Sequence, residues 1–465
     1  MEEKGNMGDE QEKKYLLMTE APLEKLVLKL AGPAIITMLV TSFYNMTDTY
    51  FVGNLGTSAS GAIGISMSLM TLIQACGHFF GQGSGNYIAR ALGTKDVEKA
   101  ERMAITALSA SVICSLGILL VGLINLEQLA RWLGSTDTIL PYAKDYIRFI
   151  LVGAPFKMGS IVLSVQLRFQ GNSFIGMIGL VSGAVLNIAL DPLLIYAFNI
   201  GISGASIATA IGQGASFFLL LIYMQRSNGI RLSICKTTFK IHYLKNIVLG
   251  GAPSLVRQGI GSAATICLNL VAKGYGDAAV AAMGIVDRMA HFVNSVLLGF
   301  SQGYQPVCGF NFGAKRFDRV QKGFYTAVKM GTVCLTALSF ICIITAPNIV
   351  SLFRNDQEVI AIGAAALAYQ CYSLPFNAWS SFSDMCLQSV GKTKGSIVIA
   401  LSRRGLFFIP LIFVLTHFWG VLGMQLARPV ANMMGFIIAV PLQLRFFTEL
   451  RKMETFCQSC SPISQ

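Results

Sequence analysis

The chain has 465 residues, of which 54% are hydrophobic and only 13% are charged, and its formal net charge is +13. Soluble globular proteins carry about 25% charged residues, so this composition excludes an ordinary soluble domain. Apolar runs long enough to cross the hydrocarbon core of a bilayer recur along the whole chain. The sequence therefore predicts an all-α polytopic membrane protein.

Taken in chain order, the apolar segments predict about twelve membrane-spanning helices. They cover residues 29–52, 58–89, 104–126, 138–166, 173–198, 201–225, 246–272, 277–309, 324–346, 359–388, 395–418 and 420–447. The expected parts of the chain are a cytoplasmic tail (1–20), a six-helix lobe (21–225), a basic connector (226–245), a second six-helix lobe (246–447) and a second cytoplasmic tail (448–465). The first twenty residues hold no apolar core ahead of a cleavage site, so we expect no removable signal peptide.

Basic residues gather in alternate loops. Lysines and arginines follow the second, sixth and eighth predicted spans, whereas the segments NLGTSAS, FNIGIS and FWGVLG contain none. Because loops rich in Lys and Arg stay in the cytoplasm, we expect both termini there and the protein in the plasma (cytoplasmic) membrane. The same bias accounts for most of the positive net charge, so we expect no binding of nucleic acid.

The two halves of the chain resemble each other at a constant shift of 220 residues. The matched positions include Phe80/Phe300, Gln82/Gln302, Gly83/Gly303 and Pro155/Pro375. Each half holds six predicted spans, an even number, so both halves enter the membrane from the same side. We expect two six-helix bundles related by a pseudo-two-fold axis along the membrane normal, as in many secondary transporters.

Two predicted spans each carry a single acidic residue. Asp191 is the only charged residue in 174–198, and Asp48 is the only one in about 31–52. Asn187 lies four residues before Asp191 and therefore projects from the same helix face. Carboxylates inside a membrane are costly and mark ion pathways by default. The alternative is that both acids merely hydrogen-bond to neighbouring helices.

Further oxygen atoms are expected close to these acids. Pro192 cannot donate to the carbonyl of Ile188, and its ring disturbs the preceding turn. Thr209 and Tyr146, on other spans, offer hydroxyl groups. This composition suits a proton-sensitive hydrogen-bond network or an oxygen-lined Na⁺ site.

Four segments, in this order and within a six-plus-six repeat, resemble the MATE (multidrug and toxic compound extrusion) family of the prokaryotic type. They are NMTDTYFVGNLG, GQGSGNYIARALG, LNIALDPLLI and GISGASIATA, and the resemblance covers roughly residues 21–447. It implies export of drugs or metabolites driven by H⁺ or Na⁺, without another cofactor. It also implies that Asp48, Asn187, Asp191 and Thr209 share one cation-linked pocket, beside which Tyr146 is a further candidate.

The second half departs from the first. At the 220-residue shift, Leu411 occupies the place of Asp191 and Phe407 that of Asn187, so the ion site is not duplicated. The spans of the second half instead carry Arg257, Asp287, Arg288, Asp384, Arg403, Arg404 and Arg428. These residues either form bridges between helices, or the arginines line a cavity and bind an anionic group. The candidates for lining the substrate cavity are Tyr44, Met70, Arg257, Asp287, Arg288 and Arg428.

We expect a secondary exporter that works by alternating access of its two lobes, as a monomer in the lipid bilayer. Its substrate would be an organic cation, or an anionic or zwitterionic metabolite bound by the second-half arginines. The alternative is a flippase for a lipid-linked precursor, from the same superfamily. We do not expect an enzyme, because the sequence offers no His-rich cluster and no plausible Ser/His or Cys/His arrangement. The sequence also lacks GxxxxGK(S/T), which excludes ATP as the energy source within this chain.

Overall fold

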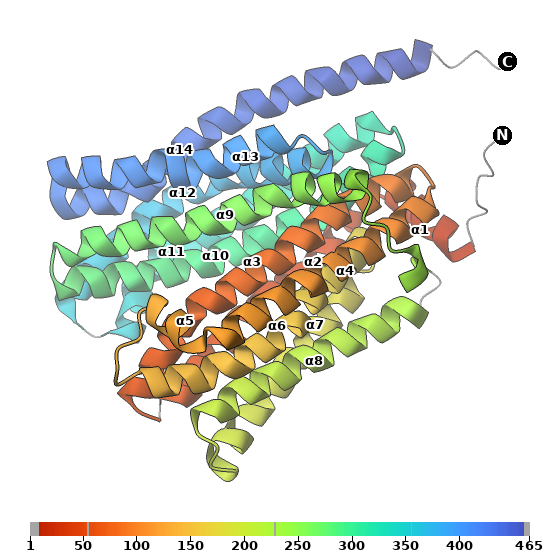
Figure 1. Ribbon diagram of the computed structural model, residues 1–465. Coiled ribbons are helices and arrows are strands. Elements are labelled where there is room, and N and C mark those ends of the chain that lie inside the picture. Colours follow the sequence, from red (N-terminus) through yellow and green to blue (C-terminus); the bar gives the residue numbers. More distant parts are fainter. Residues whose placement is uncertain (1–8, 54, 227–228, 355, 460–465) are drawn as a thin grey trace. The chain divides into compact units, whose positions relative to one another are not determined.

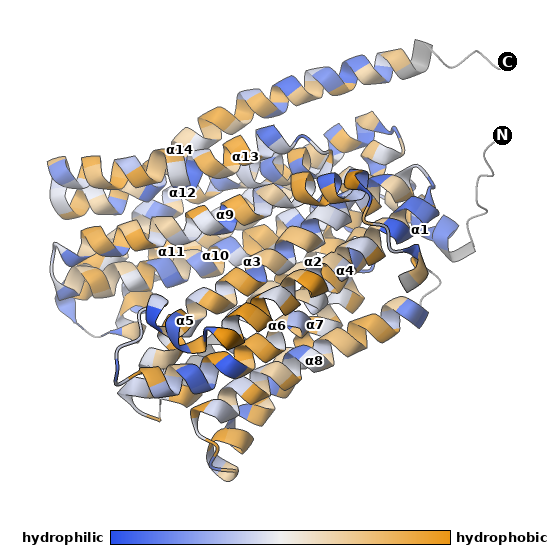
Figure 2. Ribbon diagram, viewed as in Figure 1, coloured by the Kyte–Doolittle hydropathy of each residue, from blue (hydrophilic) through white to orange (hydrophobic). Residues whose placement is uncertain are grey.

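The computed structural model describes residues 9–53, 55–226, 229–354 and 356–459, and these residues form helices without any strand (Figure 1). The outermost parts of the two expected tails lie outside the described residues. Ten helices in the described part are long and apolar enough to cross a membrane. Figure 2 shows apolar residues along these spans and hydrophilic residues in α1 and around α5. The chain is therefore a multi-pass membrane protein.

The first half contains the six spans that its apolar segments predict. Its helices are α1 (Asp9–Glu20), α2 (Leu23–Gly53), α3 (Thr57–Gly93), α4 (Val97–Ile124), α5 (Leu126–Trp132), α6 (Leu140–Phe169), α7 (Ser173–Pro192), the π-helical turn η1 (Leu193–Ala197) and α8 (Ile202–Arg226). The spans are α2, α3, α4, α6, α7 with η1, and α8. Two helices, α1 and the short α5, were not expected from the apolar pattern.

The second half begins after a short 3₁₀ turn, η2 (Ile234–Lys236). It consists of α9 (Ile241–Lys273), α10 (Asp277–Gly313), α11 (Phe317–Phe353), α12 (Gln357–Ser389), α13 (Thr393–Leu401), the π-helical turn η3 (Ser402–Phe407) and α14 (Phe408–Ser459). Gly420, at φ 57° and ψ −133°, interrupts α14, in a region that favours glycine. The break divides the stretch from α13 onward into two spans. The prediction of an all-α fold with about twelve spans is confirmed.

The helices form two compact units, and the chain passes from one unit to the other inside α1, α2 and α9. The first unit contains the described residues up to Leu17 and Gly32–Leu255, and the second contains Met18–Ala31 and the described residues from Val256 onward. Pro33 and Pro253, which are separated by the 220-residue shift, lie close to the divisions in α2 and α9.

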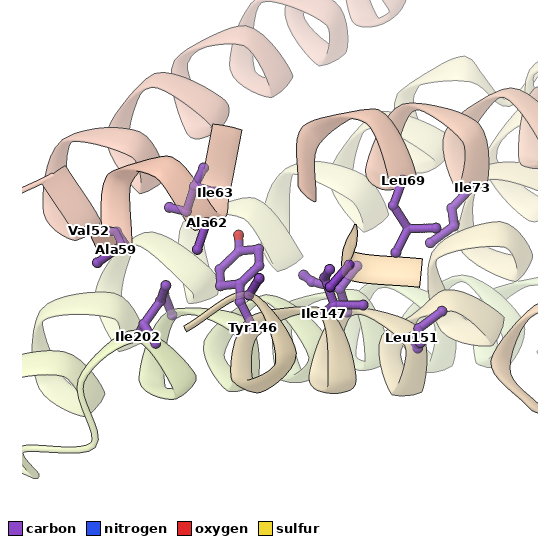
Figure 3. Close-up of a cluster of buried hydrophobic side chains, with 14 of the residues drawn as sticks. Val52, Ala59, Ala62, Ile63, Leu69, Ile73, Tyr146, Ile147, Leu151 and Ile202 are labelled. Atoms are coloured by element: carbon purple, nitrogen blue, oxygen red, sulfur yellow. The ribbon is translucent and has the colours of Figure 1, made fainter. Parts of the chain in front are cut away.

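Within the first unit, a hydrophobic core joins α2, α3, α6 and α8 (Figure 3). Its buried members include Val52, Ala59, Ala62, Ile63, Leu69, Ile73, Tyr146, Ile147, Leu151 and Ile202. The close-up shows the hydroxyl group of Tyr146 pointing away from the backbone of α6. Tyr146 therefore packs its ring in the core and still presents a polar group to neighbouring helices.

The contact between α7 and α8 depends on two glycines. A Cβ atom at Gly183 would lie 2.0 Å from Ser216 Oγ and 2.2 Å from the carbonyl oxygen of Gly212. A Cβ atom at Gly212 would lie 2.5 Å from the carbonyl oxygen of Gly183. Small residues let helix backbones approach closely in membranes. Because Gly183 precedes Asn187 by about one turn, this approach brings Asn187 next to α8.

We expect Gly183→Ala to destabilise the protein by about 1–3 kcal/mol, the usual cost of overpacking a tight contact. The added methyl group would push α7 away from the backbone of α8. Thermal unfolding of the purified protein in detergent measures this as a lowered midpoint.

Gly214→Ala is the matched control on α8, because no heavy atom lies within 4 Å of its built Cβ position. The substitution should leave the midpoint unchanged or raise it, since Ala favours helix over Gly. Equal midpoints for the two variants would contradict the close approach at Gly183.

Candidate functional site

The acidic residue of α2 is buried and has a hydrogen-bond donor on α6. Asp48 is 3% exposed and Tyr146 is fully buried. The hydroxyl group of Tyr146 donates to Oδ2 of Asp48 at 3.0 Å. The ring of Tyr146 is held in the hydrophobic core, which fixes the position of this donor.

A second set of hydrogen bonds connects α7, α8 and α2. The side-chain amide of Asn187 donates to Oδ1 of Asp191 at 3.3 Å and to Oγ1 of Thr209 at 3.1 Å. The hydroxyl groups of Thr209 and Tyr44 lie 3.4 Å apart. Since Tyr44 and Asp48 are one turn apart on α2, the residues expected from the sequence lie in one region of the first unit. Like Asp48 and Tyr146, the side chains of Tyr44, Asn187, Asp191 and Thr209 are buried.

Three acceptor oxygens of this network have no hydrogen-bond donor within the described residues: Asp48 Oδ1, Asp191 Oδ2 and Asn187 Oδ1. A buried polar atom without a partner costs free energy. A proton on either carboxyl group would supply a donor. A hard cation would instead take several oxygens as ligands. The arrangement is therefore chemically suited to bind a proton or a small cation.

The helical path continues beyond Pro192, the proline expected to disturb α7. Pro192 keeps helical angles (φ −64°, ψ −32°), and the chain continues through the π-helical turn η1. In this turn the amide of Phe198 donates to the carbonyl oxygen of Leu193 at 3.0 Å. The wider turn accommodates the proline directly after Asp191, and such turns are frequent at functional sites.

The network adjoins a cavity of about 90 Å³ within the first unit. Tyr44, Asn187 and Thr209 line it, and so does Lys157 of α6. A water molecule needs about 10–15 Å³ in this measure, so the cavity has room for several. A second cavity, of about 40 Å³, is lined by Tyr44, Lys157 and Met70, among others. Tyr44 and Met70, two candidates for the substrate cavity, are thus cavity-lining residues of the first unit.

The other four cavity candidates lie in the second unit, and three of them form ion pairs. Arg257 pairs with Asp384, which also accepts a hydrogen bond from Ser396. Nη2 of Arg428 lies 2.6 Å from Oδ1 of Asp287. The fourth candidate, Arg288, is exposed. Arg403, in η3, donates to the hydroxyl group of Ser381 at 3.1 Å.

The lone carboxylates in the sequence do not point to Lys157. The signal that the sequence offers is a lysine near the middle of the predicted span 138–166, which also contains Lys144, Asp145 and Arg148. No group of three or more His, Cys, Asp or Glu side chains suited to a metal ion occurs in the described part of the chain.

Proteins of known function and known structure resemble this chain over most of its length. It is 28% identical over 394 residues to multidrug export protein MepA of Staphylococcus saprophyticus, and the aligned region is 84% of this chain and 87% of that protein. It is 28% identical over 420 residues to MepA of Staphylococcus aureus strain MSSA476, and there the aligned region is 90% of this chain and 92% of that protein. A crystal structure of MATE in complex with MaL6 has the same fold, with a TM-score of 0.89 and 24% sequence identity. The superposition covers 95% of this chain and 99% of that chain.

The MatE family model matches the chain twice, at residues 33–193 and 253–414. The two matches begin 220 residues apart (253 minus 33), which is the shift of the internal repeat. Together they cover more than half of the sequence, and each match falls on one half of the chain. The chain therefore belongs to the MATE family.

Proposed function

We propose that this protein exports small organic molecules across the cytoplasmic membrane in exchange for H⁺ or Na⁺. Two of its relatives are multidrug export proteins, which supports a broad substrate class. The observation that carries the proposal is the buried network of Asp48, Asn187 and Asp191, in which three acceptor oxygens have no donor among the residues that the structure describes. These oxygens are what a transported proton or Na⁺ would bind.

Substrate export is coupled to the entry of H⁺ or Na⁺ if the two lobes open alternately to the two sides of the membrane. Both carboxyl groups would be ionised when substrate is bound, and protonated or bound to Na⁺ when substrate leaves. A conformational change can be driven this way only if each ligand binds the two states with different affinity. Asp191 is the central residue, because Asn187 connects it to Thr209 of α8 and, through Thr209, to Tyr44 of α2.

The orientation of the protein in the membrane follows from the charges of its loops. The basic segment between α8 and α9 and the basic loops after α3 and α10 would face the cytoplasm. Both termini would lie on that side, since the number of spans is even. We propose that a single chain is the transporting unit, because each unit carries its own core and the network lies within the first.

We expect Asp191→Asn to lower gradient-driven efflux of a cationic dye by at least tenfold. The amide cannot exchange a proton, and it removes the charge that would hold Na⁺. The assay uses proteoliposomes loaded with the ethyl ester of rhodamine B, under a pH gradient and, separately, a Na⁺ gradient. The gradient that drives efflux in the wild type identifies the ion.

Asp137→Asn is the control. The side chain of Asp137 is exposed and pairs with Arg131 at the surface, where an ion pair contributes little. Efflux by this variant should match the wild type. Normal coupled efflux by well-folded Asp191→Asn protein would exclude Asp191 as the coupling residue, and no efflux by the wild type under either gradient would refute the proposed function.

We propose that Arg257 and Arg428 hold helices of the second unit together, because each has a carboxylate partner. Arg257→Met should lower the stability of the protein by about 3–5 kcal/mol, since it leaves Asp384 as an uncompensated buried charge. The double variant Arg257→Met/Asp384→Leu should recover much of this loss.

Thermal unfolding in detergent measures the effect, with Arg288→Met as the control because Arg288 is exposed. If Arg257→Met is as stable as Arg288→Met but loses transport, the Arg257–Asp384 pair serves transport and not the fold.

A further inference from the structure

Lys157 lies near the middle of the membrane-spanning helix α6. It is followed by twelve more residues before the helix ends at Phe169, which corresponds to about 18 Å along the axis at 1.5 Å per residue. The other end of the helix is farther away. Lysines near the ends of a span extend their ammonium groups to the membrane surface, but this distance is too long for Lys157 to do so.

The ammonium group has no acidic partner in the described residues. No carboxylate oxygen there lies within the 4.0 Å that defines an ion pair with Nζ. Arg257 and Arg428, by contrast, each pair with an aspartate. Lys157 is partly buried, and it lines the two cavities described above. It is therefore a cavity-lining cation without a carboxylate partner among the described residues.

The cavity of about 90 Å³ suits an anionic group. Among the described residues that line it, none is Asp or Glu. The lining includes the guanidinium group of Arg168 and the hydroxyl group of Ser216. The hydroxyl groups of Ser160 and Ser164 line it as well, but they already donate to the carbonyl oxygens of Lys157 and Gly176. Hydroxyl groups and cations are the donors that bind carboxylates. The same cavity also reaches Asn187 and Thr209, which belong to the network of Asp191.

We propose that Lys157 is a substrate-binding residue that receives the anionic group of a small zwitterionic substrate in this cavity. The proposal rests on the proposed export function and deepens it by naming the substrate class. The carboxylate of the substrate lies against Lys157, in the cavity that Arg168 and Ser216 also line. Its cationic group faces the network of Asp48 and Asp191. An organic cation without an acidic group occupies only the position near the network of Asp48 and Asp191 and makes no contact with Lys157.

The test compares two dyes that differ in one group. Rhodamine B carries a carboxylate and is a zwitterion, whereas its ethyl ester is a cation with the same ring system. Binding to the purified full-length protein in detergent is measured by fluorescence polarisation. The wild type should bind rhodamine B at least tenfold more tightly than the ester. Lys157→Met should abolish this preference and leave the affinity for the ester within about twofold, and Lys157→Arg should retain the preference.

Several results would overturn the proposal. One is a wild type that binds the ester as tightly as rhodamine B, and this comparison decides the matter even if Lys157→Met does not fold. Another is Lys157→Met protein that keeps the preference, or that loses affinity for both dyes equally, as a purely structural lysine would predict. Gradient-driven efflux of both dyes separates the two proposals. If either dye is exported but binding shows no preference for rhodamine B, only the role of Lys157 fails. If neither dye is exported, the export function fails, and the role of Lys157 in binding a transported substrate fails with it.

Discussion

The burial of two carboxyl groups among apolar helices constrains how the helices of the first unit pack. A carboxylate in a medium of low dielectric constant is tolerated only with donors around it. Tyr146 of α6 donates to Asp48 of α2, whereas Asn187 donates to Asp191 of its own helix, α7, and to Thr209 of α8. The close approach of α7 and α8 at Gly183 makes the last contact feasible. Three acceptor oxygens of the network nevertheless have no donor in the described part of the chain, and they make the site a candidate for binding an ion.

The two units show that one duplicated fold can carry two different charge arrangements. The second half has Leu411 at the position that corresponds to Asp191, so it lacks an equivalent of this carboxyl group. Two arginines of the second unit have a carboxylate partner, in the pairs Arg257–Asp384 and Arg428–Asp287. The first unit keeps acceptors without donors and a lysine without an acid among its described residues. The buried carboxyl groups that lack donors among the described residues therefore lie in the first unit.

The positions of the spans could be predicted because about twenty apolar residues in succession have few alternatives to a transmembrane helix. Asp48 and Asp191 could be singled out because a lone acid in such a run is costly. Which helix faces meet could not be predicted, since these helices are apolar on most sides and show little periodicity. For that reason the sequence did not indicate that Lys157 lines a cavity beside Asn187, or that α2 and α9 are shared between units. The π-helical turn after Pro192 was also unforeseen, because proline alone predicts only a disturbance.

Lys157 and the two aspartates constrain the substrate when they are considered together. Protonation or Na⁺ binding removes negative charge from the network, which weakens the binding of a cationic group nearby and strengthens the binding of an anionic one. An antiporter must release substrate when the ion binds, because the coupling free energy acts equally in both directions. A purely anionic substrate at Lys157 would be retained at that step. A zwitterion is released as long as its cationic group lies closer to the network than its anionic group does. The charges of the cavity are thus compatible with ion-driven export of a substrate that carries both signs, with the cationic group toward Asp191 and the anionic group toward Lys157.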